Sequence, residues 1–257
     1  MSKLVIHPKD RTTDFLKPIY HGRNDTTVIT GDCTKTEVEN AIDKHDHIIM
    51  LGHGTPQGLL AMNQFNGKPK PAYKPSHVVR NGGKTVVTNA EINDLYSSTS
   101  KVDGYTTGKR DDGIKAYSSY QGGFSEDHGY YGGNNGYVID DMTTDKLAGK
   151  KLTSIWCNAD QYMEWNELEG FYTGMFISDE GEAKMIGTAD TDKWQVEESN
   201  YAFVSIVRRF LDQTPERLHA ALMLEYGEMA DRNAIAKYNL HRLYTRTNAD
   251  NAAVRAI

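Results

Sequence analysis

Short apolar runs alternate with helical spacing in the first part of the chain, and this alternation restricts the fold more than any other feature. The strand-like runs are the apolar segment 3–7, the β-rich segment 26–30 and the apolar segment 47–51. Between the second and third runs, Thr34 and Glu37 have the spacing of a helix capping box, and apolar residues follow at helical intervals. Strand, helix and strand with short connections are typical of a parallel sheet with crossover helices. We therefore predict an α/β fold.

The same alternation returns in the second half of the chain. An apolar run at 151–156 predicts another buried strand, and helical spacing marks 199–211 and the segment from Thr214 to Met229. These elements predict a three-layer α/β sandwich with a mostly parallel sheet. The less regular segments are predicted as a short helix at 14–20, strands at 137–140 and 183–187, the tail of a helix at 171–177 and a helix at 233–244.

The composition changes between residues 63 and 136. This segment holds about half of the chain's 23 glycines, with tyrosines spread among them, and its clearest regular signal is the β-rich run 84–88. A structureless loop of this length inside a compact domain is uncommon. We therefore predict one domain over 1–257 with an insertion at 63–136, which forms either a small β-rich lobe or a flap.

Charge and cysteine content restrict the setting and the partners of the protein. The formal net charge of −6 gives no general attraction to nucleic acid or to an anionic membrane. No apolar run approaches the roughly 18 residues of a membrane span, and MSKLVIHPKD does not have the pattern of a signal peptide. Two cysteines do not make a disulfide framework, so we expect a reducing, cytoplasmic setting. We predict no cofactor, no nucleic-acid partner and no membrane partner.

Two of the predicted buried strands end in residues that can carry chemistry. The run 47–51 is followed by His53 between two glycines, and the run 151–156 is followed by Cys157. Sites in a parallel sheet gather at the carboxyl ends of its strands, and neighbouring strands lie about 4.8 Å apart. If the two strands are neighbours, His53 and Cys157 form a base and nucleophile pair. The backbone N–H groups of Gly54 and Cys157 are then the natural donors to an oxyanion.

An apolar strand that ends in His-Gly, followed later by an apolar strand that ends in Cys, resembles the caspase-like (clan CD) cysteine peptidases. This family includes caspases, metacaspases, legumain, clostripain and gingipains, and the resemblance covers about residues 1–62 and 137–210. It implies a single caspase-like α/β domain that hydrolyses peptide bonds in a protein or peptide substrate. It also implies that His53 is the general acid and base, Gly54 an oxyanion donor and Cys157 the nucleophile of this thiol protease.

Three features depart from the family's pattern. Trp156 stands before the cysteine where the family has a small residue, Asn158 follows it where the family has glycine, and the insertion at 63–136 is large. Because successive side chains of a strand alternate, Trp156 can face the core on the opposite side from Cys157. The alternative function is a catalytically inactive caspase-like protein that binds a partner through 63–136. Another cysteine-based hydrolase or acyl transferase is a third.

Cys33 and Asp160 are further candidates for a role in this site. Cys33 is the rival nucleophile, because it also follows a strand and precedes a helix N-terminus, but we interpret it as structural since the strand of Cys157 is expected beside that of His53. Since the family selects substrates by the residue before the cut, Asp160 is predicted either to floor a pocket for a basic side chain or to cap a helix. We predict no metal site, because His47 and His53 on one strand lie about 20 Å apart and no CxxC or HExxH spacing occurs.

Overall fold

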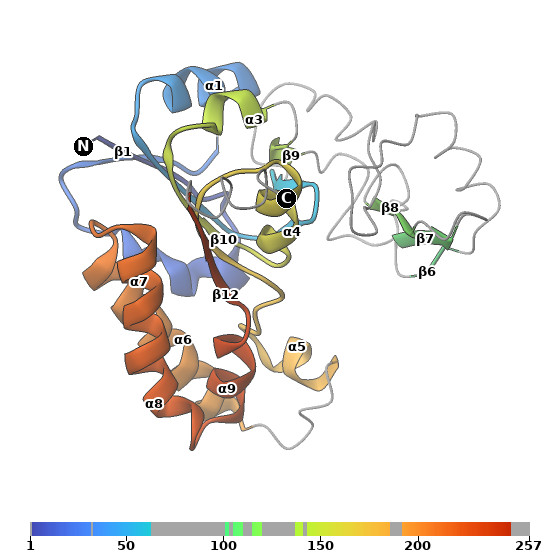
Figure 1. Cartoon of the computed structure of the whole chain (residues 1–257), viewed down its shortest axis with the longest axis vertical. Coiled ribbons are helices and arrows are strands. Elements are labelled where there is room, and N and C mark those ends of the chain that lie inside the picture. Colours follow the sequence, from blue (N-terminus) through green and yellow to red (C-terminus); the bar gives the residue numbers. More distant parts are fainter. Residues whose placement is uncertain are drawn as a thin grey trace, which may run out of the picture.

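The computed structural model has a central sheet of six strands in the order β12-β11-β10-β3-β1-β2 (Figure 1). Five strands run parallel, and β12 is antiparallel at one edge. The strands are β1 (Lys3–Ile6), β2 (Thr26–Ile29), β3 (His47–Leu51), β10 (Lys151–Ile155), β11 (Gly170–Thr173) and β12 (Leu243–Arg246). The predicted mostly parallel sheet is therefore confirmed. The structure describes residues 2–31, 33–62, 101–102, 105–109, 115–119, 137–140, 143–185 and 192–247.

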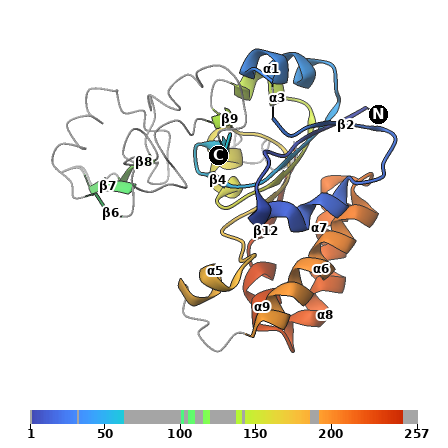
Figure 2. The same cartoon turned by 180° about the vertical axis from the view of Figure 1, so that it is seen from behind.

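Helices cover both faces of the sheet (Figure 1, Figure 2). Successive strand residues face opposite sides, so Val5 and Ile49 join one apolar cluster, whereas Leu4 and Ile48 join the other. The first cluster is completed by η1 (Arg11–Ile19), α6 (Lys193–Phe210), α7 (Pro215–Ala221), the π-helical turn η4 (Leu222–Tyr226) and α9 (Ala234–Leu240). The second is completed by α1 (Lys35–Asp43), α3 (Thr144–Leu147) and α4 (Ala159–Trp165). This arrangement is compatible with the predicted three-layer sandwich.

Local signals in the sequence mark where the helices of these layers begin. The predicted capping box is present at α1, where the Thr34 hydroxyl accepts from the backbone N–H of Glu37 and the Glu37 carboxylate accepts from the backbone N–H of Thr34. Pro215 lies in the first turn of α7, and η4 and α8 (Gly227–Ala230) extend that helix as predicted.

Within the described residues, no helix has both the length and the apolar character needed to cross a membrane.

A small second sheet joins the two ends of the predicted insertion. It consists of β4 (Gly54–Thr55), β5 (Gly58–Leu60) and β9 (Tyr137–Ile139), and Leu60 of β5 pairs with Tyr137 of β9. The chain therefore leaves this sheet after β5 and returns to its neighbouring strand. Inside 63–136 the structure describes only β6 (Lys101–Val102), β7 (Tyr105–Lys109) and β8 (Lys115–Ser119), which form a three-stranded antiparallel sheet. The predicted strand at 84–88 lies outside the described residues.

Two segments predicted as helical contain strands instead. The prediction for 171–177 is wrong because β11 pairs with β10, and Phe171 and Tyr172 enter the apolar clusters on opposite faces. The prediction for 233–244 is right only for α9, because the chain then continues into β12. There Tyr244 stacks on Tyr172 with ring centroids 5.8 Å apart. In both segments, pairing with a neighbouring strand outweighs the local pattern.

Two further boundaries differ from the prediction. The described part of 183–187 belongs to helix α5 (Glu180–Met185), because the Asp179 carboxylate accepts from the N–H of Glu182 as a helix cap does. The helix predicted at 14–20 is the 3-10 helix η1, which starts earlier because Asp10 caps it through the N–H of Thr12. In each case an aspartate ahead of the segment is the signal that fixes where the helix begins.

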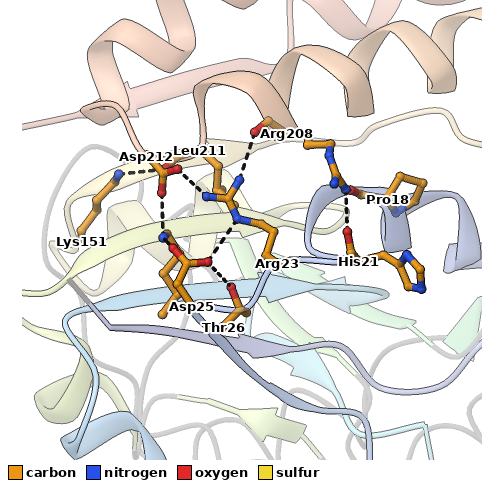
Figure 3. Close-up of polar contacts among 10 residues, drawn as sticks. Pro18, His21, Arg23, Asp25, Thr26, Lys151, Arg208, Leu211 and Asp212 are labelled. Atoms are coloured by element: carbon orange, nitrogen blue, oxygen red, sulfur yellow. Dashed lines mark hydrogen bonds and ion pairs between the residues drawn. The ribbon is translucent and has the colours of Figure 1, made fainter.

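A polar network joins the amino end of β1 to the turns before β2 and after α6 (Figure 3). The Lys3 side chain is only 6% exposed and pairs with both Asp25 and Asp212. Arg23 contacts the same two carboxylates. The hydrogen bond from Lys3 lowers the pKa of Asp25 to about 2. The network lies at the opposite edge of the sheet from the ends of β3 and β10, and we assign it a structural role.

Candidate active site

The prediction that the strand before His53 lies next to the strand before Cys157 is confirmed. Strands β3 and β10 pair in parallel, with Leu51 opposite Ile155, and the N–H of Gly52 donates to the Ile155 carbonyl oxygen at 3.1 Å. The segments that follow β3 and β10 therefore leave the sheet side by side, at the carboxyl ends of its strands. His53 is the second residue beyond β3, and Cys157 is the second residue beyond β10.

His53 and Cys157 line one small cavity with a volume of about 20 Å³. The other lining residues come from η1, from the strand ends and from the chain after β11: Thr13, Phe15, Leu16, Gly52, Ile155, Trp156, Thr173, Phe176, Ser178 and Glu182. A space of this size holds about one water molecule. A substrate carbonyl therefore reaches the thiol only after some of this lining moves.

The His53 ring is held from the side of η1. Its Nε2 lies 2.6 Å from the Thr12 hydroxyl oxygen and 3.7 Å from a carboxylate oxygen of Asp10. Burial lowers the pKa of His53 below its ordinary value, while the negative charges of Asp10 and Asp179 oppose this change. The imidazole is therefore favoured as the neutral form, which is the form that a general base needs.

The Cys157 thiol is enclosed. Its Sγ–H donates to the Phe176 carbonyl oxygen at 3.6 Å, and burial, with a smaller contribution from the carboxylate of Glu182, raises the pKa of the thiol to about 12. Asn158 then takes a left-handed conformation with φ of 66°, and α4 starts directly after it. In this conformation Cys157 is a protonated thiol rather than the thiolate that a nucleophile requires.

Trp156 lies on the other side of the strand from Ile155, as alternation predicts, and its indole covers Gly54. A Cβ on Gly54 would lie 2.0 Å from Cδ1 of the indole. The Trp156 Nε1–H also donates to the Thr55 carbonyl oxygen at 3.3 Å. The bulky residue that departs from the family's pattern is therefore accommodated by the glycine that follows His53.

Replacement of Gly54 by alanine should destabilise the protein, because the new methyl group has no space beneath the Trp156 indole. We expect Gly54→Ala to lower the free energy of unfolding by about 1–3 kcal/mol, the usual cost of overpacking. Urea unfolding followed by tryptophan fluorescence measures this value. The matched control is Gly227→Ala, where the nearest heavy atom to the new Cβ is a Leu240 methyl carbon at 3.7 Å. Equal stability of the two variants would contradict the close Gly54–Trp156 contact.

Asp160 lies in the first turn of α4, while Asn158 occupies the cap position. One of its carboxylate oxygens is buried and has no hydrogen-bond partner among the described residues. The other would lie 3.4 Å from a Cβ on Gly174. Burial raises the pKa of Asp160 to about 6. The carboxylate is outside the set of described residues that lines the His53–Cys157 cavity, but its negative charge contributes to the raised pKa of the Cys157 thiol.

The remaining candidates lie away from this cavity. Cys33 is partly buried and packs against the apolar cluster that contains α1. His47 is buried at the start of β3, where its Nε2 lies 3.0 Å from the Thr153 hydroxyl oxygen. Over the described ranges, no group of three or more His, Cys, Asp or Glu side chains could hold a metal ion.

Four residues of the site were missed by sequence reasoning: Asp10, Thr12, Phe176 and Glu182. Only Asp10 and Thr12 carry a recognisable signal, because an aspartate two residues before a threonine is typical of a helix cap. Phe176 acts through its backbone carbonyl, which no residue pattern reveals. Glu182 reaches the cavity only because α5 folds back towards the end of β10.

Comparison of the chain with protein-family models, with curated proteins and with solved structures finds no match. What the molecule itself provides is an α/β fold with a mostly parallel sheet and a histidine–cysteine pair at its carboxyl edge. The function is therefore inferred from this arrangement.

Proposed function

We propose that the protein is a cysteine endopeptidase of the caspase-like type. The observation that carries the proposal is the parallel pairing of β3 with β10, which delivers His53 and Cys157 to the same cavity. A thiol and an imidazole at adjacent strand ends are the pair that nucleophilic acyl transfer requires. The neutral state favoured for His53 supports a role as base.

In the proposed reaction, His53 takes the proton of the Cys157 thiol, and the sulfur attacks the scissile carbonyl carbon. The resulting oxyanion accepts hydrogen bonds from the backbone N–H groups of Gly54 and Cys157. His53 then gives its proton to the leaving amine, which produces a thioester on Cys157. Water, deprotonated by His53, hydrolyses the thioester and restores the thiol.

In this proposal the present conformation is a closed, resting form of the enzyme. The thiol donates to the Phe176 carbonyl, and Phe176, Ser178 and Glu182 belong to the one connection that follows β11. Withdrawal of this connection would open the cavity and give the thiol access to a substrate carbonyl. It would also remove burial, the largest cause of the raised thiol pKa.

A second candidate function is a catalytically inactive caspase-like protein that binds a partner through 63–136. The specific observation in its favour is the state of Cys157, whose pKa of about 12 belongs to an inert thiol. The pairing of β5 with β9 supports it further, because both ends of 63–136 are anchored on neighbouring strands beside the site.

Cleavage of a peptide library separates the two functions. If the protein is a peptidase, we expect peptide fragments from the wild-type protein and none from Cys157→Ala or His53→Ala. Cys33→Ala should still form these fragments, because Cys33 packs in the core away from the cavity. Mass spectrometry of the digests measures this directly. No cleavage by the wild-type protein would favour the inactive binding protein, and loss of cleavage in Cys33→Ala alone would show that Cys157 is not the nucleophile.

A further inference from the structure

Asp10 and Thr12 form a short chain of hydrogen bonds that ends on His53. The Asp10 carboxylate accepts from the backbone N–H of Thr12 at 2.8 Å and from its hydroxyl group at 2.5 Å. The same Thr12 oxygen lies 2.6 Å from Nε2 of His53. The side chains of Asp10 and His53 are 17% and 14% exposed, whereas Thr12 between them is an exposed residue of η1.

The donor in each of these contacts follows from the chemistry of the groups. An ionised carboxylate only accepts hydrogen bonds, and a hydroxyl group has a single proton to donate. The Thr12 proton is therefore directed to Asp10, and the lone pairs of its oxygen face His53. Nε2 of His53 must then carry a proton, and its Nδ1 carries the basic lone pair.

We propose that Asp10 and Thr12 are positioning residues, which hold His53 as the Nε2–H tautomer so that Nδ1 is the nitrogen that receives the proton of Cys157. The role of Nδ1 as a base rests on the proposed function. The tautomer and the part of Asp10 in it follow from the described contacts alone. The pair Asp10–Thr12 thereby extends the His53–Cys157 dyad into a chain of four side chains.

The segment that carries Asp10 and Thr12 is itself held in place by hydrogen bonds of the buried His7. The buried His7 ring contacts the Thr13 hydroxyl through Nε2 at 3.1 Å and the Tyr20 hydroxyl through Nδ1 at 3.0 Å. The Thr13 hydroxyl donates to the Asp10 carbonyl oxygen at 3.2 Å. His7 therefore holds both ends of η1 against β1, and a site supported in this way keeps its geometry.

A purely structural role for Asp10 would be the cap of η1, which its hydrogen bond to the N–H of Thr12 supplies. The two roles are separable, because asparagine caps a helix as well as aspartate does but carries no charge. Asp10→Asn therefore keeps the cap and removes the charge. Thr12→Val removes the hydroxyl group at constant shape, and Thr12→Ser restores it.

Long-range ¹H–¹⁵N NMR of the histidine-labelled protein tests the proposal without any need for peptidase activity. The His53 signals are assigned by their loss in His53→Gln. We expect the wild-type protein and Thr12→Ser to show His53 with the proton on Nε2, and Thr12→Val to lose this preference. Protonation of Nδ1 in the wild-type protein would overturn the proposal, whether or not the protein cleaves peptides.

A pH titration of the same signals tests the part played by Asp10. Among the described residues, the charged or titratable groups near His53 include Asp10, Asp179 and His7, together with Cys157 and Glu182 in the same cavity. We expect Asp10→Asn to lower the pKa of His53, because the carboxylate stabilises the imidazolium. The control Asp14→Asn removes the same charge from the exposed side of η1 and should leave this pKa in place. An equal shift in both variants, or no shift in Asp10→Asn, would overturn the proposal.

The kinetic consequence is measured on the peptide substrate that the library assay yields. Thr12→Val should lower kcat at least about tenfold with KM nearly unchanged, and Thr12→Ser should recover most of the loss. An unchanged kcat beside a changed tautomer would refute the catalytic use of Nδ1. If the wild-type protein cleaves nothing, the proposed function fails, whereas the NMR result still decides the tautomer.

Discussion

Iodoacetamide is expected to alkylate Cys157 of the native protein, at pH 7, on the order of a thousandfold more slowly than it alkylates the same thiol in the unfolded chain. The reason is the rise of the thiol pKa from 9.0 to about 12, because each pKa unit lowers the thiolate fraction tenfold. The measurement uses Cys33→Ala, so that Cys157 is the one thiol present, and compares native and urea-unfolded protein by intact mass. Comparable rates in the two states would contradict the closed conformation of the site.

The contribution of Glu182 to this slow reaction can be measured separately. Glu182→Gln removes the negative charge beside the thiol and keeps the size of the side chain, whose Oε2 accepts from both the backbone N–H and the hydroxyl group of Ser178. We expect alkylation of Cys157 in this variant to be faster than in its Cys33→Ala parent. Glu180→Gln, on the same helix but outside the cavity lining, is the matched control and should leave the rate unchanged.

The second large effect is a loss of stability in mild acid. Burial lowers the pKa of His7 to about 4 and that of His47 to about 3, whereas both titrate near 6.5 in the unfolded chain. Between these values the two histidines bind protons in the unfolded state only, so together they lower the free energy of unfolding as the pH decreases. Asp160 opposes part of this loss, because its raised pKa lets the folded state bind a proton first. Each histidine contributes about 1.4 kcal/mol per pH unit, which reaches roughly 3 kcal/mol for His7 at pH 4 and more for His47.

Urea unfolding at pH 7, 5.5 and 4.5 measures this loss. His47→Gln cannot titrate but can still donate to the Thr153 hydroxyl oxygen, so we expect it to remove more than half of the net pH dependence, because Asp160 offsets part of what the two histidines contribute. His7→Gln should remove a similar share. His21→Gln, a substitution of an exposed histidine, is the control and should retain the full dependence. A stability that is constant from pH 7 to pH 4.5 would show that His7 and His47 are not held neutral in the fold.

The centre of the fold could be predicted from the sequence because its strands are apolar on both faces. β1 and β3 read as apolar runs, and the apolar residues of β1, β3 and β10 enter both apolar clusters. The edge strand β12 could not be predicted in this way, because its residues Leu-Tyr-Thr-Arg continue the spacing of α9 and only Leu243 is fully buried. Its strand conformation depends on pairing with β11, which is a tertiary effect.

The same distinction applies to the site. His53 and Cys157 could be predicted because each follows a buried strand, and parallel strands deliver their carboxyl ends to one edge. The groups that set the properties of the pair come from segments without a strong pattern: Asp10 and Thr12 from the start of η1, Phe176 and Glu182 from the chain after β11. These side chains meet His53 and Cys157 only because the tertiary packing of η1 and α5 brings them to the end of β10.

The central claim, that His53 and Cys157 act as a catalytic pair, is tested most directly by a library of peptidyl acyloxymethyl ketones. Such a reagent binds the site through its peptide, as a substrate does, and alkylates the thiol only when the thiol is activated for attack. We expect a covalent adduct on Cys157, found by peptide mapping, that is absent in His53→Ala and unchanged in Cys33→Ala. An adduct on Cys33, or equal modification of Cys157 in the wild-type protein and His53→Ala, would contradict it.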